Sequence, residues 1–411
     1  MTSLKQDSKL RVGIVAVFAA LLTLTGCTAP AQTPGDNGPG DVLHFNQGGT
    51  FKILSLSDIQ DGANVSPLTI KLITLALDSE KPDLVVLNGD NIFDWAPSLL
   101  FSGGNVQKSI GTFLKPITDR GIPFALVFGN HDSTLPMGQQ AQWDYIHTFP
   151  GALGTANTIG DRVGNYNVVV DDRSGKPALN LWFLNSGGHT LSATGADMLP
   201  GQLDWYKTAS DALTTANGGD PVPSIVFQHI PVPQIYDLLT PVAKGTPGAV
   251  KGSGAHSGGY YVAGPAVTDG TLGEGPCPLD TDKAEFDTWL QQGDVMGAVF
   301  GHDHNNSFGG RVQDIRLMYD AGTTFYSYGN GNLHGVRVLE FNEGSVQQYQ
   351  THMVYWKDLT KDPIPVNAQF DGTFAHGAQY LYIAIGALIL LALVGLVIVV
   401  VRRIRRRRNA S

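Results

Sequence analysis

The most constraining feature of this chain is a series of apolar runs, each followed directly by a short polar motif. Four runs have the length and composition of buried strands, and a shorter fifth run covers residues 224–227. Segments with helical periodicity lie between the runs. The alternation predicts an α/β fold of two packed mixed sheets with helices outside them, a four-layer α/β/β/α sandwich. The four longer runs are residues 51–56, 84–87, 124–128 and 295–300.

The motifs place carboxylate, amide and imidazole groups at the ends of these predicted strands. Ligands of open α/β sheets bind at the carboxyl ends of the strands, so the motifs are expected to converge on one site. In chain order they are Asp58-Ile59-Gln60, Gly89-Asp90-Asn91, Gly129-Asn130-His131-Asp132, Gln228-His229-Ile230-Pro231 and Gly301-His302-Asp303-His304.

These residue types suit a pair of metal ions. Two divalent or trivalent ions roughly 3.5–4 Å apart can clamp a phosphoryl group and activate a water molecule. A carboxylate must bridge ions that close together, and Asp90 is the best candidate for the bridge. Taken alone, His229 could equally be a structural histidine. The set of oxygen and imidazole donors favours Mn, Fe or Zn over metals selected by thiolates, and the donors besides Asp90 are Asp58, Asn130, His229, His302 and His304.

The ordered motifs resemble the calcineurin-like metallophosphoesterase superfamily, whose pattern is Asp-x-His, Gly-Asp, Gly-Asn-His-Asp/Glu, His and Gly-His-x-His. The resemblance covers roughly residues 50–350 and is most similar to the purple acid phosphatase 29-like subgroup. It implies that His131 is not a ligand but touches the substrate phosphate and helps the leaving group depart. It implies a first metal held by Asp58, Gln60, Asp90 and His304, and a second held by Asp90, Asn130, His229 and His302.

Two positions depart from the family pattern. Gln60 stands where the superfamily has histidine, so a neutral amide replaces an imidazole. Purple enzymes also lack that histidine but place a tyrosine three residues after the bridging aspartate, where this chain has Phe93. We therefore expect a first metal site weaker than in either pattern.

Both ends of the chain lie outside the predicted domain, which covers residues 50–356. Residues 1–26 resemble a bacterial lipoprotein signal peptide that would leave Cys27 lipidated; an uncleaved anchor or an ordinary cleaved signal are the alternatives. Residues 380–401 carry no charge and are long enough for a transmembrane helix, and the arginine-rich tail at 402–411 marks the cytoplasmic side. Residues 27–49 and 357–379 are predicted to be flexible linkers.

Charge and topology together define the predicted function. Nine of the 27 Lys and Arg residues lie in the two ends, which leaves residues 27–401 with about 17 more acidic than basic residues. Nucleic-acid binding is therefore not indicated, and an anionic substrate would need a local cation such as a bound metal ion. We predict an extracellular, membrane-anchored phosphoesterase that hydrolyses phosphate monoesters or diesters of a small molecule or a surface substrate, using a metal-activated water. The alternatives are a degenerate surface binding protein that keeps the metal-site residues and, more remotely, a tethered structural protein.

Overall fold

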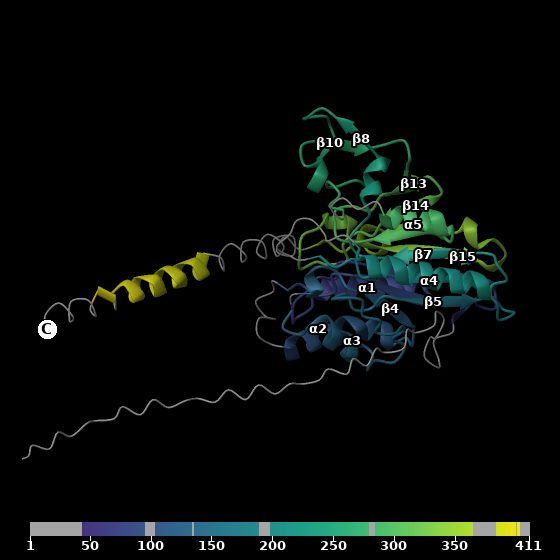
Figure 1. Ribbon diagram of the computed structural model, residues 1–411, viewed down its shortest axis with the longest axis horizontal. Coiled ribbons are helices and arrows are strands. Elements are labelled where there is room, and N and C mark those ends of the chain that lie inside the picture. The colour runs from purple at the N-terminus through teal and green to yellow at the C-terminus, as the bar shows by residue number, and fades with distance from the viewer. Residues whose placement is uncertain are drawn as a thin grey trace, which may run out of the picture. The chain divides into compact units, whose positions relative to one another are not determined.

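The computed structural model describes residues 43–94, 103–133, 135–188, 198–278, 284–364, 384–399 and 401–402. The predicted signal peptide, Cys27, most of both predicted linkers and most of the basic tail lie outside these residues. Figure 1 shows the helices and strands with the labels used below.

The smaller of the two main sheets has five strands in the order β16-β15-β2-β3-β4. The three strands that precede the first three motifs run parallel to one another, whereas β15 and β16 are antiparallel, so the sheet is mixed. The strands are β2 Thr50–Leu56, β3 Leu84–Asn88, β4 Phe124–Val127, β15 Gly335–Asn342 and β16 Gln350–Tyr355.

The larger sheet has eight strands in the order β1-β5-β6-β7-β12-β14-β13-β11. Its central strands β6, β7, β12 and β14 are parallel and its edges contain antiparallel pairs, so it is mixed as well. The strands are β1 Leu43–His44, β5 Tyr166–Asp171, β6 Pro177–Phe183, β7 Ser224–Phe227, β11 Val267–Asp269, β12 Val295–Phe300, β13 Gly309–Val312 and β14 Ile315–Tyr319.

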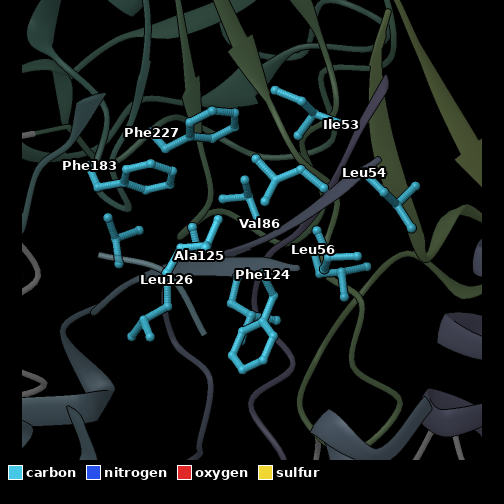
Figure 2. Packing of buried hydrophobic residues seen from close by; sticks show 14 of the residues in the cluster. Ile53, Leu54, Leu56, Val86, Phe124, Ala125, Leu126, Phe183 and Phe227 are labelled. Atoms are coloured by element: carbon cyan, nitrogen blue, oxygen red, sulfur yellow. The ribbon is translucent and has the colours of Figure 1, made fainter. Parts of the chain in front are cut away.

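Two apolar cores hold the sheets and helices together. The first joins side chains of both sheets with the inner faces of α1 Pro67–Glu80, α2 Gly103–Thr118 and α3 Gln139–Ile146. Figure 2 shows its central part, where Val86 of the smaller sheet lies near Phe183 and Phe227 of the larger one. The second core fills the other face of the larger sheet, under α4 Pro200–Ala216 and α5 Ala284–Gln292. The two mixed sheets therefore pack on each other, and each is covered by helices on its outer face.

Helix α1 illustrates how local sequence sets these elements. Ser66 caps its first turn by accepting a hydrogen bond from the backbone N–H of Leu68 at 3.3 Å, and Pro67 occupies the first helical position, where its missing N–H costs nothing. Lys81 ends the helix in the left-handed conformation. The buried residues recur at helical spacing and form the face that packs into the core: Thr69, Leu72, Ile73, Ala76 and Leu77.

Residues 241–280 are rich in glycine and show no strand or helix pattern in the sequence, yet part of this segment forms regular structure. Three short strands here pair as an antiparallel sheet, β8 Leu239–Val242, β10 Tyr260–Ala263 and β9 Val250–Lys251, and β11 joins the larger sheet. Strands of two to four residues separated by glycines are too short to display a period of two.

The ends of the domain extend beyond the expected limits. Strand β1 pairs with β5 and Phe45 is buried, so ordered packing begins inside the stretch expected to be a linker. At the other end, α6 Trp356–Leu359 packs on α1. Residues 384–399 are helical and expose their apolar side chains. Within the described ranges, no helix combines the length and apolar character needed to cross a membrane. The predicted span at 380–401 includes residues outside these ranges and stays a prediction.

Candidate metal centre

All five motifs follow strands at one edge of the two sheets. β2, β3 and β4 of the smaller sheet lead into the first three motifs, and β7 and β12 of the larger sheet lead into the last two. A backbone bridge between Ser57 and Gly322 joins the chain beyond β2 to the turn beyond β14. The carboxyl ends of parallel strands from both sheets thus meet, as expected from the positions of the motifs in the sequence.

Acidic and imidazole groups of the motifs approach one another closely at this edge. The Asp90 carboxylate lies 3.1 Å from His229 Nε2, and the Asp58 carboxylate lies 3.2 Å from His304 Nε2. His229 Nε2 is also 3.8 Å from Asp58, so this imidazole stands between the two carboxylates. Ligand atoms of Asp90, His229 and His302 lie within 4.8 Å of one another, a spacing that a single metal ion could bridge.

Four buried polar atoms of the site have no hydrogen-bond partner among the described residues. Leaving such an atom unpaired costs about 1–3 kcal/mol, so native proteins rarely bury several together. All four are lone-pair donors that a cation would satisfy. They are Asp58 Oδ1, Gln60 Oε1, Asn130 Oδ1 and His229 Nε2, and each belongs to a residue predicted as a ligand. The residues present therefore fit a metal centre.

The opposite ends of these side chains are held by hydrogen bonds. His229 Nδ1 lies 3.0 Å from the Asn88 carbonyl oxygen, and His304 Nδ1 lies 2.7 Å from the Tyr328 carbonyl oxygen. A carbonyl can only accept, so both imidazoles carry their proton on Nδ1 and present a bare Nε2 to the site. The second oxygen of Asp58 accepts from Ser57 Oγ at 2.7 Å and from the His302 backbone N–H at 3.1 Å.

Four motif residues adopt the left-handed backbone conformation that residues other than glycine usually avoid. Their φ angles are 52° for Asp58, 37° for Gln60, 46° for Asp90 and 75° for His302. Each such residue costs on the order of 1 kcal/mol or more and persists only where its surroundings hold it. The strain coincides with the predicted ligands and turns their side chains toward one another.

The motif glycines are required by close packing around these ligands. A Cβ atom at Gly129 would lie 2.1 Å from Asp90 Oδ1, and one at Gly301 would lie 1.8 Å from Ser57 Oγ. At Gly89, which has a φ of 87°, a Cβ would meet the His229 ring at 2.5 Å. Any side chain at these positions would displace a predicted ligand or its support.

Gln60 occupies the place that the family pattern gives to histidine. Its Nε2 donates to Asp90 Oδ2 at 3.1 Å, while its Oε1 is one of the unpaired buried atoms. The amide therefore offers an oxygen to the site and at the same time supports the carboxylate predicted to bridge. Its role as a ligand, like that of the other motif residues, stays a prediction.

His131 lies at the rim of the site, and sequence reasoning missed its partner. Its Nδ1 is 2.6 Å from an oxygen of Asp94, and its Nε2 is 3.9 Å from Asp90 Oδ2. The side chain is 19% exposed, unlike the fully buried His229. Asp94 follows Asp90 by four residues in the same loop, but nothing in the local sequence points to a partner near residue 131.

The charged groups of the site shift one another's pKa values, some upward and some downward. Burial lowers the pKa of His131, but the carboxylates of Asp90 and Asp94 outweigh it and raise this pKa above the usual value. For Asp90, burial acts to raise the pKa, yet His229 and His131 bring it well below its ordinary range. Burial is the main cause that lowers the pKa of His302 to about 3, so this imidazole is neutral and able to bind metal.

Asp132, the last residue of its motif, has a structural role. Its carboxylate accepts hydrogen bonds from the backbone N–H groups of Gly129 at 2.9 Å, Asn91 at 3.1 Å and Ile92 at 3.2 Å. Burial and the nearby Asp90 raise its pKa to about 7. It joins the loops after β3 and β4 and so fixes Asn130 and His131 beside Asp90.

This arrangement agrees with comparison to known proteins. Residues 51–306, more than half of the chain, match the model of the calcineurin-like phosphoesterase family. The chain belongs to the calcineurin-like phosphoesterase family, and the resemblance inferred from the motifs is confirmed.

Its similar proteins include two from Arabidopsis thaliana. The chain is 29% identical over 365 residues to a protein named probable inactive purple acid phosphatase 14, a match that covers 80% of this chain and 83% of that protein. It is 28% identical over 390 residues to probable inactive purple acid phosphatase 29, covering 84% and 90%. Among solved structures, a dimetal phosphatase from Danio rerio aligns with 14% identity and a TM-score of 0.41, covering 74% of this chain and 98% of that one.

Proposed function

We propose that this protein is a metal-dependent phosphoesterase that hydrolyses phosphate monoesters or diesters at a dinuclear centre. The observation that carries the proposal is the convergence of four unpaired, buried donor atoms beside a rim histidine. A structural protein that holds no metal ion gains nothing from burying unpaired donors and strained backbone at one point.

Two groups of residues would hold the metal ions. Asp58, Gln60 and His304 would hold the first ion, and Asn130, His229 and His302 the second, with Asp90 between them. When bound, a pair of Mn, Fe or Zn ions supplies positive charge that neutralises the phosphoryl oxygens and acidifies a water nucleophile. This positive charge would also offset the negative charge of the domain, which would otherwise repel an anionic substrate.

His131 would serve the leaving group. Asp94 holds its Nδ1, so its Nε2 faces the rim of the site. Because the pKa of His131 is raised, the ring is available in its protonated form and can donate the Nε2 proton to the departing ester oxygen. The P–O bond to the alcohol breaks as that oxygen takes the proton, and His131 is left neutral.

Phe93 would keep the enzyme colourless. The purple colour of related enzymes arises from a tyrosinate bound to ferric iron, and the Phe93 ring carries no oxygen. It packs between His131 at 5.5 Å and Tyr326 at 6.1 Å, measured between ring centroids. We expect the isolated metal-loaded protein to show no visible charge-transfer band.

A degenerate binding protein is the second candidate. The names of the Arabidopsis relatives, with their words probable inactive, and the amide at Gln60 favour it. The presence of His131 with its Asp94 partner favours turnover, because neither residue is needed to retain a metal ion.

Metal content and turnover of phenyl phosphate and of the matching diester separate the two candidates. We expect Asp90→Ala to lose metal and activity together. We expect His131→Ala to keep its metal and to lose about 10²–10⁴-fold in rate, the range for removing an acid catalyst. Bound metal without turnover of either ester in the unmodified protein would identify the binding protein. Full activity in His131→Ala would refute the role assigned to that residue.

We also propose that the domain lies outside the cell and is attached to the cell membrane. An N-terminal lipid at Cys27 and a C-terminal span at residues 380–401 would hold the domain at the outer face of the cell membrane. The uncharged apolar run and the arginines that follow it support this topology.

A further inference from the structure

A segment outside the five motifs runs beside the loop that carries His302 and His304 and is joined to it by hydrogen bonds. We name residues 271–277 the strap. The Thr271 backbone N–H donates to Ser307 Oγ at 3.1 Å, and the Ser307 backbone N–H donates back to the Thr271 carbonyl at 2.9 Å. At the far end of the strap, the Cys277 backbone N–H donates to the Asp303 carboxylate at 2.9 Å.

The centre of the strap bonds even more closely to the residues after His304. Asn306 Oδ1 accepts from the backbone N–H groups of Gly273 at 3.0 Å and Glu274 at 3.1 Å. In return, the Asn305 backbone N–H donates to Glu274 Oε1 at 2.8 Å. A Cβ atom at Gly273 would lie 2.3 Å from the Asn305 carbonyl oxygen, so only glycine permits this approach.

Glu274 also contacts the residue that supports His304 from behind. The Tyr328 hydroxyl hydrogen-bonds the Glu274 side chain. The Tyr328 ring stacks on the His304 imidazole with centroids 4.1 Å apart and an interplanar angle of 10°, and the Tyr328 carbonyl oxygen accepts a hydrogen bond from His304 Nδ1–H. One carboxylate therefore holds both the backbone that follows His304 and the aromatic ring that packs on it.

The Glu274 charge is not neutralised by a basic side chain. In the described part of the chain, no lysine or arginine forms an ion pair with it. The nearby basic group is the imidazole of His304, on the Asp58 side of the site. This is the side where Gln60 supplies a neutral amide, so a further negative charge here would strengthen the attraction for a cation.

We propose that Glu274 is a positioning residue of the first metal site, where it orients His304 and contributes a negative charge behind the ligands. It does not touch the ion. The inference rests on the proposed function, since it requires that Asp58, Gln60, Asp90 and His304 hold a metal. Outer partners of metal ligands typically contribute about 10–100-fold to metal affinity.

The test is a Zn²⁺ competition titration of the full-length protein against a chromophoric chelator, which resolves a tight and a weak site. Glu274→Gln keeps the size of the side chain and an oxygen for the Asn305 N–H but removes the charge. We expect the weak-site dissociation constant to rise about 10–100-fold and the tight-site constant to change less than about twofold. Glu274→Asp, which restores the charge, should recover part of the loss.

Glu340→Gln is the matched control, because Glu340 lies on β15 with its side chain 41% exposed and pairs with Lys52. It should leave both constants unchanged. Unchanged constants in Glu274→Gln would overturn the inference. Equal weakening of both sites together with a lower melting temperature would also overturn it, because Glu274 would then be a general structural support. Absence of zinc binding by the unmodified protein would instead refute the proposed function, and this inference with it.

Discussion

The His131 imidazole lies between two carboxylates that act on different ring nitrogens. Asp94 is 2.6 Å from Nδ1, whereas Asp90 is 3.9 Å from Nε2. Asp90 is predicted to share its charge with metal ions, so Asp94 is the carboxylate that both orients the ring and keeps its pKa high. The histidine proposed to be catalytic and the acid that orients it are thus separate residues with separable effects.

Asp94→Asn tests this division. An asparagine can still accept from Nδ1 but carries no charge, so the pKa of His131 should fall. Because His131 acts in its protonated form, activity is lost as pH rises through that pKa, and the basic limb of the kcat profile should therefore move to lower pH. At the pH optimum we expect a loss of about tenfold or more, within the contribution of acid catalysis. The measurement is kcat against pH for phenyl phosphate, with metal content determined in parallel. An unshifted basic limb at unchanged metal content would show that Asp94 does not set the His131 pKa.

Gln60→His restores the donor of the family pattern. An amide oxygen is a harder and less basic ligand than imidazole, so the native first site should tolerate Mn or Mg better and hold Zn more weakly. The substitution should raise zinc retention through dialysis and shift the metal preference of activity toward zinc. Gln60→Ala is the control that removes the donor altogether. If the unmodified protein keeps two equivalents of metal through chelator treatment and neither variant changes this, Gln60 is not a ligand.

At the residue scale, the side chains of the five motifs could be predicted from the sequence, but the residues that hydrogen-bond to them could not. The five motifs could be found because each follows a recognisable apolar run. Asp94, Asn88 and Glu274 could not, because their contacts to His131, His229 and the residues after His304 cross from one loop to another. A single sequence carries no record of such contacts.

At the scale of elements, the turn between β14 and β15 contains a histidine that the fold keeps neutral. His334 is buried, its Nδ1 lies 3.1 Å from the Gly322 carbonyl oxygen, and Phe325 packs against its ring. Gly322 in turn packs against His304, so this turn lies against one of the predicted metal ligands. Burial lowers the pKa of His334 to about 4, against an ordinary value of 6.5.

The lowered pKa predicts a specific loss of stability in acid. Above pH 6.5 the ring is neutral in both the folded and the unfolded chain, so it contributes no pH dependence. As pH falls from 6.5 to about 4, the unfolded chain binds a proton that the folded chain excludes, and the free energy of unfolding decreases. The shift corresponds to a loss on the order of 3 kcal/mol.

Denaturant unfolding between pH 4 and 8 measures this loss, with His334→Gln as the variant. The variant should be less stable at neutral pH, because it loses ring packing, but its stability should fall less steeply in acid. His352→Gln, at an exposed position on β16, should retain the native slope. Equal acid slopes in all three proteins would show that His334 is not the group responsible.

The elements that the sequence predicted best are those with a long, regular pattern. The strands before the motifs and the helices between them correspond to described elements, since each buries one continuous apolar face. The three-stranded sheet of β8, β10 and β9 was missed because its stability comes from tertiary packing. Tyr236 and His256, from the short turns that adjoin its strands, pack with Tyr261 of β10, and these stacked and edge-on contacts join residues up to 25 positions apart.

At the scale of the whole molecule, the predicted anchors and the charge of the domain are consistent with one another. Residues 27–401, with about 17 more acidic than basic residues, have no electrostatic attraction to an anionic membrane surface. Stable attachment must therefore come from covalent lipid or from an inserted helix. One acyl chain gives only marginal binding, so a lipid at Cys27 alone would not hold the domain permanently, whereas an inserted helix would.

The predicted topology leaves residues 28–378 outside the cell and Ser411 inside. Protease added to intact cells should then remove the catalytic domain and spare a tag placed after Ser411, whereas permeabilised cells should lose the tag as well. Cys27→Ser should prevent lipidation and shift the mass of the N-terminal peptide, yet the protein should stay in the membrane fraction, because the span at 380–401 is sufficient to anchor it. Deleting residues 380–411 in the Cys27→Ser background should release a soluble, active enzyme. Release by Cys27→Ser alone would show that the C-terminal segment does not span the membrane, and an unchanged N-terminal mass would show that Cys27 carries no lipid.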